Sequence, residues 1–487
     1  MSALPSRPGD LGQTLGPTRP RSLIVLGAML AFIVAGSVVL SGGNLLGILI
    51  LSPIGLLLAL GMLRGIDALA SRFGYEGVFW LALMLAASIA FRAPSAPALS
   101  AALPTHPLQV LEPSIGLICA AFLGARILRA GRKALDWARN PVTAPLLIYS
   151  LFGMSASFSV SHGANALFYA GELVVALGLT VLVANREKGS NVEGSELLLI
   201  TAGTVVALAL LLAAFAPGYA FTLRSGEIRR LGGWLMHPNQ LGFLAAASSL
   251  GFLQRLLTGP SRRGLVLSTA GLAASAWALG ASRGRADFAG FAAGAFLVLL
   301  ASKRGRWLLL AVPSGLIALV IHPQWAYPLV LLANRGMTTL RSLRPPLWLN
   351  IWQQTLASPA RMLRGVGIGV GRFQLEGLFP KWPDPAHAHN VLFEGLLALG
   401  FPGALLILSA ILILGWKILV LVNATWRAPH PLLVEALAVF VCLMMVSAVE
   451  ASFAGRVSAY TCSYLALDVA VIRLSRTPDP IQEILRS

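Results

Sequence analysis

The stretch VLFEGLLALGFPGALLILSAILILGW, residues 391–416, decides the fold class. Glu394 is its one charged residue, and Leu, Ile, Ala and Gly dominate the remainder. A helix of about 20 apolar residues is long enough to cross the hydrocarbon core of a bilayer. Because lipid offers the backbone no hydrogen-bonding partner, a single crossing segment must be helical. Residues 391–416 are therefore predicted to form a transmembrane helix.

Runs of the same kind recur along the chain and predict about 12–14 transmembrane helices. No alternating pattern typical of barrel strands is visible. The expected fold class is therefore an all-α polytopic membrane protein. The runs lie at residues 22–41, 44–63, 76–92, 113–129, 143–160, 165–184, 195–217, 239–256, 264–281, 286–302, 307–322, 391–416, 430–449 and 458–473.

The composition excludes a soluble protein. Hydrophobic residues make up 56% of the 487 residues and charged residues only 11%, and the mean hydropathy is +0.77. Soluble domains carry roughly 25% charged residues. The net charge is +18, from 37 Lys and Arg against 19 Asp and Glu. Such a charge would on its own indicate nucleic-acid binding, so the positions of the basic residues decide its meaning.

Those positions follow the positive-inside rule. With the N-terminus in the cytoplasm and alternating spans, 23 of the 37 basic residues fall on the cytoplasmic side and 14 on the outer side. Half of the outer set lies in one long loop, residues 323–390, and long loops are exempt from the rule. Most of the charge is thus explained by topology, and we expect no nucleic-acid partner. We expect a multi-pass protein of the bacterial inner membrane with both termini in the cytoplasm.

The same reading predicts the organisation of the chain. The first run follows a basic, proline-rich start but lacks a small-residue cleavage site, so we expect an uncleaved anchor. The three cysteines lie in apolar runs and show no disulfide or metal-ligand spacing. The expected parts are a disordered cytoplasmic tail at 1–21, N-terminal transmembrane helices at 22–194, a transmembrane core with periplasmic arginine loops at 195–322, the long periplasmic loop at 323–390, C-terminal transmembrane helices at 391–473, and a cytoplasmic tail at 474–487.

Three basic clusters lie on the outer side, where positive charge works against membrane insertion. They are LRSGEIRR at 223–230, ASRGRAD at 281–287, and RSLRPPLW at 341–348 within the long loop. The Trp and Leu content of that loop suggests amphipathic helices at the membrane interface. The loop ends in DPAHAHN, which places His387 and His389 where the chain re-enters the membrane on the same face.

This combination of residues suits one kind of chemistry. Guanidinium groups bind phosphate oxygens bidentately, and a histidine can take a proton from a hydroxyl. Arginines and a histidine beside lipid therefore suggest a lipid-linked phosphate or diphosphate donor, held and stabilised as a leaving group. Asp287 and Asp384 are isolated acids, so we expect no metal and no other cofactor.

The pattern resembles the O-antigen ligase and O-antigen polymerase superfamily of bacterial lipid-linked glycan ligases and polymerases. Its His-Asn-x9-Gly-x-x-Gly motif is met by His389, Asn390, Gly400 and Gly403. The Pro-Asn-x-Leu-Gly stretch at 238–242 and the Ser-Arg-Gly at 282–284 are similar to further family motifs. The resemblance covers roughly residues 195–415. It is specific to the superfamily and not to one member of it.

The resemblance implies a C-type glycosyltransferase-like fold and a metal-independent transfer of a glycan from undecaprenyl diphosphate. The acceptor hydroxyl would belong to lipid A core, a growing polysaccharide or a protein. By the matching positions, His389 is the catalytic base, and the expected diphosphate ligands are Arg230, Arg283 and Arg344. Spacing leaves open whether Arg229, Arg285 or Arg341 takes the place of its neighbour. The candidate supporting residues are His237, Asn239, Asn390 and Glu394.

Two further expectations concern the same face. The glycine-rich residues 365–371 could cradle a phosphate through backbone amides, but a flexible turn is favoured because the P-loop Lys and Ser/Thr spacing is missing. Glu450 and Arg456 are expected to pair across a short outer turn. Glu394, a little over one helical turn after His389, is expected to orient that histidine.

Two rival functions remain open at this point. A transporter or flippase for lipid-linked glycans would also need about 14 spans, but such proteins place binding groups near the bilayer midplane, often in repeated halves. Here no internal repeat is visible and the basic clusters lie on one face. A non-catalytic assembly subunit of a polysaccharide export complex is the third reading.

Overall fold

The structure is a computed structural model. It describes residues 45–89, 111–131, 139–186, 193–222, 229–233, 235–302, 305, 344–371, 375, 387–425, 430–450 and 453–476. The predicted spans at 22–41 and 307–322 and the predicted tail at 1–21 lie outside these residues. The chain forms two compact units, residues 1–72 and 73–487, and the described part of the first is helical from residue 45 onwards.

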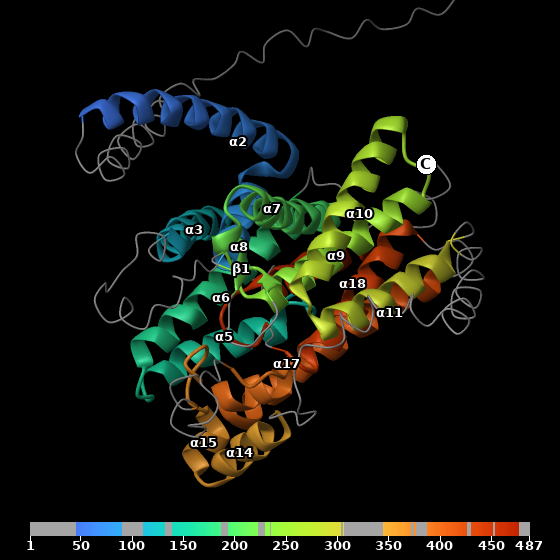
Figure 1. The fold of residues 1–487 in the computed structure, drawn as a ribbon. Coiled ribbons are helices and arrows are strands. Elements are labelled where there is room, and N and C mark those ends of the chain that lie inside the picture. Colours follow the sequence, from blue (N-terminus) through green and yellow to red (C-terminus); the bar gives the residue numbers. More distant parts are fainter. Residues whose placement is uncertain are drawn as a thin grey trace, which may run out of the picture. The chain divides into compact units, whose positions relative to one another are not determined.

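The described residues are mostly helical, as predicted (Figure 1). Two short strands, β1 (Phe221–Thr222) and β2 (Arg230–Leu231), also occur among the described residues and pair antiparallel. The helices are α2 (Leu45–Ser88), α3 (Leu111–Ala130), α5 (Ala144–Ser157), α6 (Gly163–Ala184), α7 (Glu193–Phe215), α8 (Pro217–Ala220), α9 (Pro238–Leu257), α10 (Arg262–Ser282), α11 (Arg285–Ala301), α14 (Arg344–Leu356), α15 (Pro359–Arg364), α17 (Val391–Ala424), α18 (Pro431–Ser447) and α19 (Ala459–Leu474).

Among the described residues, five helices are long and apolar enough to cross a membrane: α3, α6, α7, α10 and α17. The helices α5 and α18 are apolar but shorter. The ends of these helices agree with the predicted apolar runs within three residues, except that α17 continues to Ala424, beyond the predicted end at residue 416. The fold is therefore that of an all-α polytopic membrane protein. Within α2 the backbone is non-helical at Gly74, whose φ is +67°, so the predicted runs 44–63 and 76–92 lie on either side of this break.

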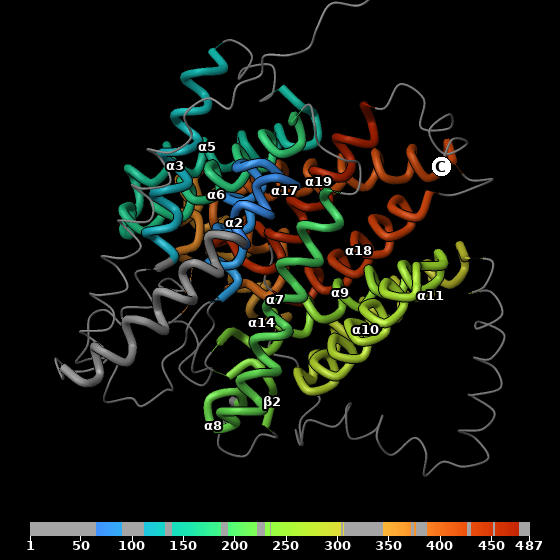
Figure 2. The backbone as a smooth tube through the Cα atoms, turned by 90° about the horizontal axis from the view of Figure 1, so that it is seen from above, coloured from blue at the N-terminus to red at the C-terminus, as the bar shows by residue number. Residues whose placement is uncertain are grey.

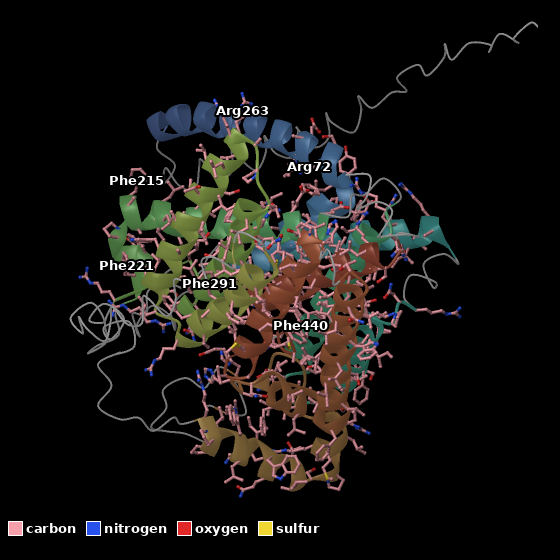
Figure 3. The ribbon with its side chains drawn as sticks, turned by 90° about the vertical axis from the view of Figure 1, so that its right-hand side faces the viewer. Arg72, Phe215, Phe221, Arg263, Phe291 and Phe440 are labelled. Carbon is pink, nitrogen blue, oxygen red and sulfur yellow. The ribbon has the colours of Figure 1, made fainter. Side chains whose placement is uncertain are left out.

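Small residues let the helices of the second unit pack closely. α9 lies against α7, α10, α11 and α18 (Figure 2). Its residues 245–249 are alanine and serine and are fully buried. In α11, Gly290 and Gly294 lie so close to α18 that a Cβ would meet the backbone of that helix. The ring of Phe440 in α18 lies 2.9 Å from the Cβ position of Gly415 (Figure 3). Such small-residue contacts are typical of membrane helix bundles.

α17 is broken near its start. Its backbone is non-helical at Leu399 and Gly400, and Pro402 follows. Residues 401–424 alone are about 36 Å long as a helix, enough for the roughly 30 Å hydrocarbon core. The break leaves carbonyl groups of Leu397 and Ala398 without helical partners. They accept hydrogen bonds from the amides of Val366 and Gly367 at 2.9 and 2.8 Å.

The predicted helices of the long loop are present as α14 and α15, which lie beside the first part of α17 (Figure 1). Leu347 and Ile351 of α14 share a buried cluster with Leu396 and Leu397 of α17. Trp348 stacks on Phe393 with ring centres 5.5 Å apart. The position of α14 is therefore fixed relative to the start of α17, where His389 lies.

Candidate functional site

His389 lies directly before α17 in a left-handed backbone conformation, with φ +53°. Among the described residues, the non-glycine residues with such a backbone are His389 and Arg283, both of them predicted site residues. A side chain there costs about 1–3 kcal/mol and persists when its surroundings enforce it, which is common at functional sites. The backbone conformation thus singles out two residues that the sequence had selected on other grounds.

Glu450 joins His389 to Arg344. Its Oε1 accepts from Nη2 of Arg344 at 2.5 Å, and its Oε2 lies 3.4 Å from Nδ1 of His389. Glu450 and His389 are largely buried, whereas the side chain of Arg344 is 31% exposed. Two predicted site residues, the candidate base and one candidate phosphate ligand, are therefore brought together by a carboxylate from a third segment.

The charge of Glu450 is stabilised by its surroundings. Burial alone would raise the pKa of this carboxyl. The hydrogen bond from His389 and the charges of His389, Arg344 and His387 outweigh burial and lower the pKa to about 2. Glu450 is therefore a carboxylate over the whole range in which imidazoles titrate, so it always offers His389 an acceptor.

Asn390 and Glu394 fix the backbone around His389. The Asn390 side chain caps α17 by accepting from the amides of Leu392 and Phe393, and its Nδ2 donates to the carbonyl of Ala448 at 2.9 Å. Glu394 accepts from the amide of Ala388 at 2.7 Å. Glu394 thus binds the backbone of the residue directly before His389.

Arg230 lies at β2, next to the start of α9. Its Nε donates to the carbonyl oxygen of Ser282 at 2.8 Å, and its Nη2 donates to the side chain of Asn239. His237 is the N-cap of α9 and accepts from the amide of Asn239. His237 therefore orders the start of α9, and Asn239 contacts the guanidinium of Arg230.

Arg283 follows Ser282 in the turn between α10 and α11, with φ +56°. It is half-buried, whereas its alternative Arg285 is exposed. A Cβ on Gly242 of α9 would meet the side chains of Ser282 and Asp287, so glycine is needed for α9 to approach this turn. The turn thus places Arg283 beside the carbonyl that Arg230 contacts.

Tyr460 is coupled electrostatically to both halves of the site. This buried residue at the start of α19 interacts electrostatically with Arg230, Asp287, Arg344 and Glu450. Its ring lies 5.0 Å from that of Phe243 in α9. Sequence reasoning missed Tyr460 and the role of Glu450. An acid near the end of an apolar run was a usable signal for Glu450, but a tyrosine in an apolar run gives none.

The expected pairing of Glu450 with Arg456 is wrong. Arg456 instead forms an ion pair with Glu112 of α3, with Nε 3.0 Å from Oε1, and lies over the ring of Tyr169. Both residues belong to the α18–α19 loop, residues 448–458. Glu450 instead contacts Arg344 and His389, which come from segments outside this loop.

The glycine segment, residues 365–371, is a packing element. Two of its amides are bonded to α17, and Ile368 and Val370 are buried. A Cβ on Gly369 would lie 2.6 Å from the ring of Tyr169. The segment is therefore inserted between helices, which favours neither the flexible turn nor the phosphate cradle considered from the sequence.

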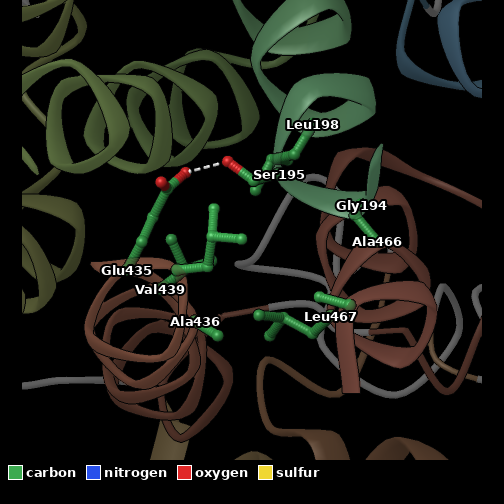
Figure 4. A pocket seen from close by; sticks show the side chains of 10 residues that line it. Gly194, Ser195, Leu198, Glu435, Ala436, Val439, Ala466 and Leu467 are labelled. Carbon is green, nitrogen blue, oxygen red and sulfur yellow. Dashed lines mark hydrogen bonds between the residues drawn. The ribbon is translucent and has the colours of Figure 1, made fainter. Parts of the chain in front are cut away.

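A pocket elsewhere contains none of the predicted site residues. It lies between α7, α18 and α19, where Ser195 donates to Glu435 at 2.5 Å (Figure 4). Its remaining lining residues are Gly or apolar. Within the described residues, no group of three or more His, Cys, Asp and Glu side chains is arranged to hold a metal ion.

The chain matches no protein-family model, and no curated protein matches it. The function must therefore be argued from the geometry of the site itself.

Proposed function

We propose that this protein is a glycan transferase of the bacterial inner membrane. It moves a glycan from an undecaprenyl-diphosphate donor to an acceptor hydroxyl on the periplasmic face, in lipopolysaccharide or exopolysaccharide biosynthesis. The observation that carries the proposal is the left-handed His389 next to a carboxylate that also binds Arg344. The site combines a base with a cation for a leaving phosphate, beside helices apolar enough for a bilayer.

His389 serves as the base. When Nδ1–H donates to Glu450, the basic lone pair of the neutral imidazole is on Nε2. The acceptor oxygen attacks the anomeric carbon while its proton passes to His389, and Glu450 stabilises the imidazolium that forms. The bond from the anomeric carbon to the diphosphate breaks, and its electron pair leaves with the diphosphate. A single displacement of this kind inverts the configuration.

Arg344, Arg230 and Arg283 bind the diphosphate. A guanidinium carries five N–H donors in a planar fork that matches phosphate oxygens, and Nη2 of Arg344 also holds Glu450 beside His389. Arg230 binds the carbonyl oxygen of Ser282, the residue directly before Arg283, and Tyr460 is coupled electrostatically to Arg230 and Arg344. Cations around the leaving group stabilise the charge that develops as the bond breaks.

The test is the His389→Ala variant, expressed in a strain whose own gene is deleted, with surface glycans analysed on gels. Transfer should be lost while the protein remains in the membrane. His162→Ala is a matched control, because His162 also precedes a helix but is exposed. Full glycan transfer by His389→Ala would rule out the mechanism.

The deletion strain also identifies the reaction. Loss of all polymer from lipopolysaccharide indicates a ligase, and single repeat units indicate a polymerase. Normal lipopolysaccharide with lost exopolysaccharide indicates an exopolysaccharide polymerase.

A flippase for lipid-linked glycans is the second candidate, and the break in α17 favours it, because transporters use discontinuous helices. In this protein, however, the amides of the glycine segment bind the carbonyl groups at the break, so the break serves helix packing. Proteoliposomes distinguish the two: a flippase moves a fluorescent lipid diphosphate across the bilayer without an acceptor, whereas a transferase does not.

A further inference from the structure

α14 presents three different faces. Leu347 and Ile351 are buried against α17. Asn350 and Gln354, one turn apart, form a polar side on which Gln354 donates to Asn350 at 2.9 Å and accepts from Arg361 at 3.1 Å. The third face is apolar and exposed, and it consists of Leu349, Trp352 and Leu356. Since these three are spaced three and four residues apart, they share one side of the helix.

The exposed face is continuous with an exposed stripe on α17. Trp352 makes an edge-to-face contact with Phe401, with ring centres 5.6 Å apart. Phe401 begins the part of α17 that follows the break. The residues after it on the same side of α17, at steps of three and four, are large, apolar and exposed: Leu405, Leu408, Leu412, Trp416 and Leu419. On a membrane-spanning helix such a stripe faces lipid.

We infer that the face formed by Leu349, Trp352 and Leu356 rests in the outer leaflet of the bilayer, as a continuation of the lipid-facing side of α17. The apolar half of α14 is then shared between α17 and lipid, and its polar side faces water. Arg361 and the exposed Arg364 lie one helix further along, where they meet lipid phosphates. Trp352 then lies near the lipid head groups, and tryptophans are enriched at such membrane–water interfaces.

The position of α14 also bears on how the donor is bound. This one point rests on the proposed function. Arg344 is the first residue of α14, and Trp348, one turn later, donates to the carbonyl of Ala388 beside His389 at 2.8 Å. An α14 resting in the leaflet holds Arg344 and His389 at the level of the phospholipid head groups. The diphosphate of a membrane-bound polyprenyl donor lies at that same level.

Spin labels on single cysteines test the placement in the full chain. The native Cys119, Cys442 and Cys462 are buried, so the unsubstituted protein is the control for labelling. Leu349→Cys and Leu356→Cys are labelled with a nitroxide in nanodiscs of phosphatidylethanolamine and phosphatidylglycerol. Collision rates with oxygen, which concentrates in lipid, are compared with those for a water-soluble nickel chelate. Asn350→Cys is the matched label on the polar side, and Leu412→Cys reports on lipid.

At positions 349 and 356 the ratio of oxygen to nickel collisions should exceed that at position 350 several-fold. It should stay below the ratio at position 412, which lies about 16 Å further along α17 and therefore deeper in the bilayer. A ratio equal to that at position 350 would overturn the inference, because the face would then lie in water. Low collision rates with both reagents would also overturn it, since a second copy of the chain or another protein would then cover the face. The readout needs no glycan transfer, so it stands or fails separately from the proposed reaction.

Discussion

At the scale of single residues, the site depends on contacts that link distant parts of the chain. Glu450 is 61 residues from His389 and 106 from Arg344 along the chain, and its carboxylate contacts both side chains. The motif histidine and the arginines could be selected from sequence because their residue types suit the chemistry. Their contacts with one common carboxylate could not be predicted, since a single sequence contains no signal for contacts at such separations.

Glu450→Gln should lower kcat for glycan transfer by roughly 100-fold or more, because an amide favours the wrong imidazole tautomer and cannot stabilise the imidazolium. The KM for the donor should change less. The measurement is steady-state transfer in nanodiscs across pH, with Glu196→Gln of α7 as a control acid outside the site. An unchanged pH profile and kcat would remove Glu450 from the mechanism.

Glu450 also predicts a pH dependence of stability. Its folded pKa of about 2 lies below its ordinary value of 4.5, so the unfolded chain binds the proton first as the pH falls. The stabilisation is present above pH 4.5 and is lost between pH 4.5 and about 2. Unfolding midpoints of wild type and Glu450→Gln in detergent should differ most near neutral pH and converge in that acidic window. A constant difference across pH would contradict the ion pair.

At the scale of elements, the apolar runs predicted the helices well because burial in lipid imposes length and composition. The break in α17 was not predicted. Residues 391–416 look like one uniform apolar run, and the partner amides of Val366 and Gly367 come from another segment. The same contact explains why the glycine segment differs from its expected role as a turn.

Gly400→Ala should destabilise the protein. Gly400 has φ +66°, and a Cβ there would meet the carbonyl of Met362. With ψ at −154°, this backbone conformation is essentially restricted to glycine and costs another residue about 1–3 kcal/mol, to which the steric conflict adds. Gly203→Ala in α7 is the matched control, since no atom lies within 4 Å of its Cβ position. The denaturation midpoint in detergent should fall only for Gly400→Ala, and equal midpoints would argue against the break.

At the scale of the whole molecule, the net charge of +18 has two origins. By the predicted topology, most basic residues lie on the cytoplasmic side, and a few arginines on the opposite face belong to the candidate site. The order of the basic residues along the sequence was sufficient for this division. The structure adds that Arg344 and Arg230, from segments far apart in sequence, are both coupled electrostatically to the buried Tyr460.

The topology predicts opposite labelling of two exposed positions. Ala360→Cys in α15 lies on the expected periplasmic side, and Thr258→Cys, between α9 and α10, lies on the expected cytoplasmic side. A membrane-impermeant maleimide should label Ala360→Cys in intact spheroplasts and Thr258→Cys only after lysis. Labelling in the reverse order would invert the orientation and move the arginine clusters to the cytoplasm.

The α18–α19 loop has a practical consequence for anyone who engineers this protein. Connections between membrane helices are the usual places for an epitope tag, a protease site or a fused reporter. Here Ala448, Glu450, Ala454 and Arg456 each contact a different partner segment. An insertion that separates these residues would break several ties at once. The exposed Thr258 between α9 and α10 is the better place for a tag.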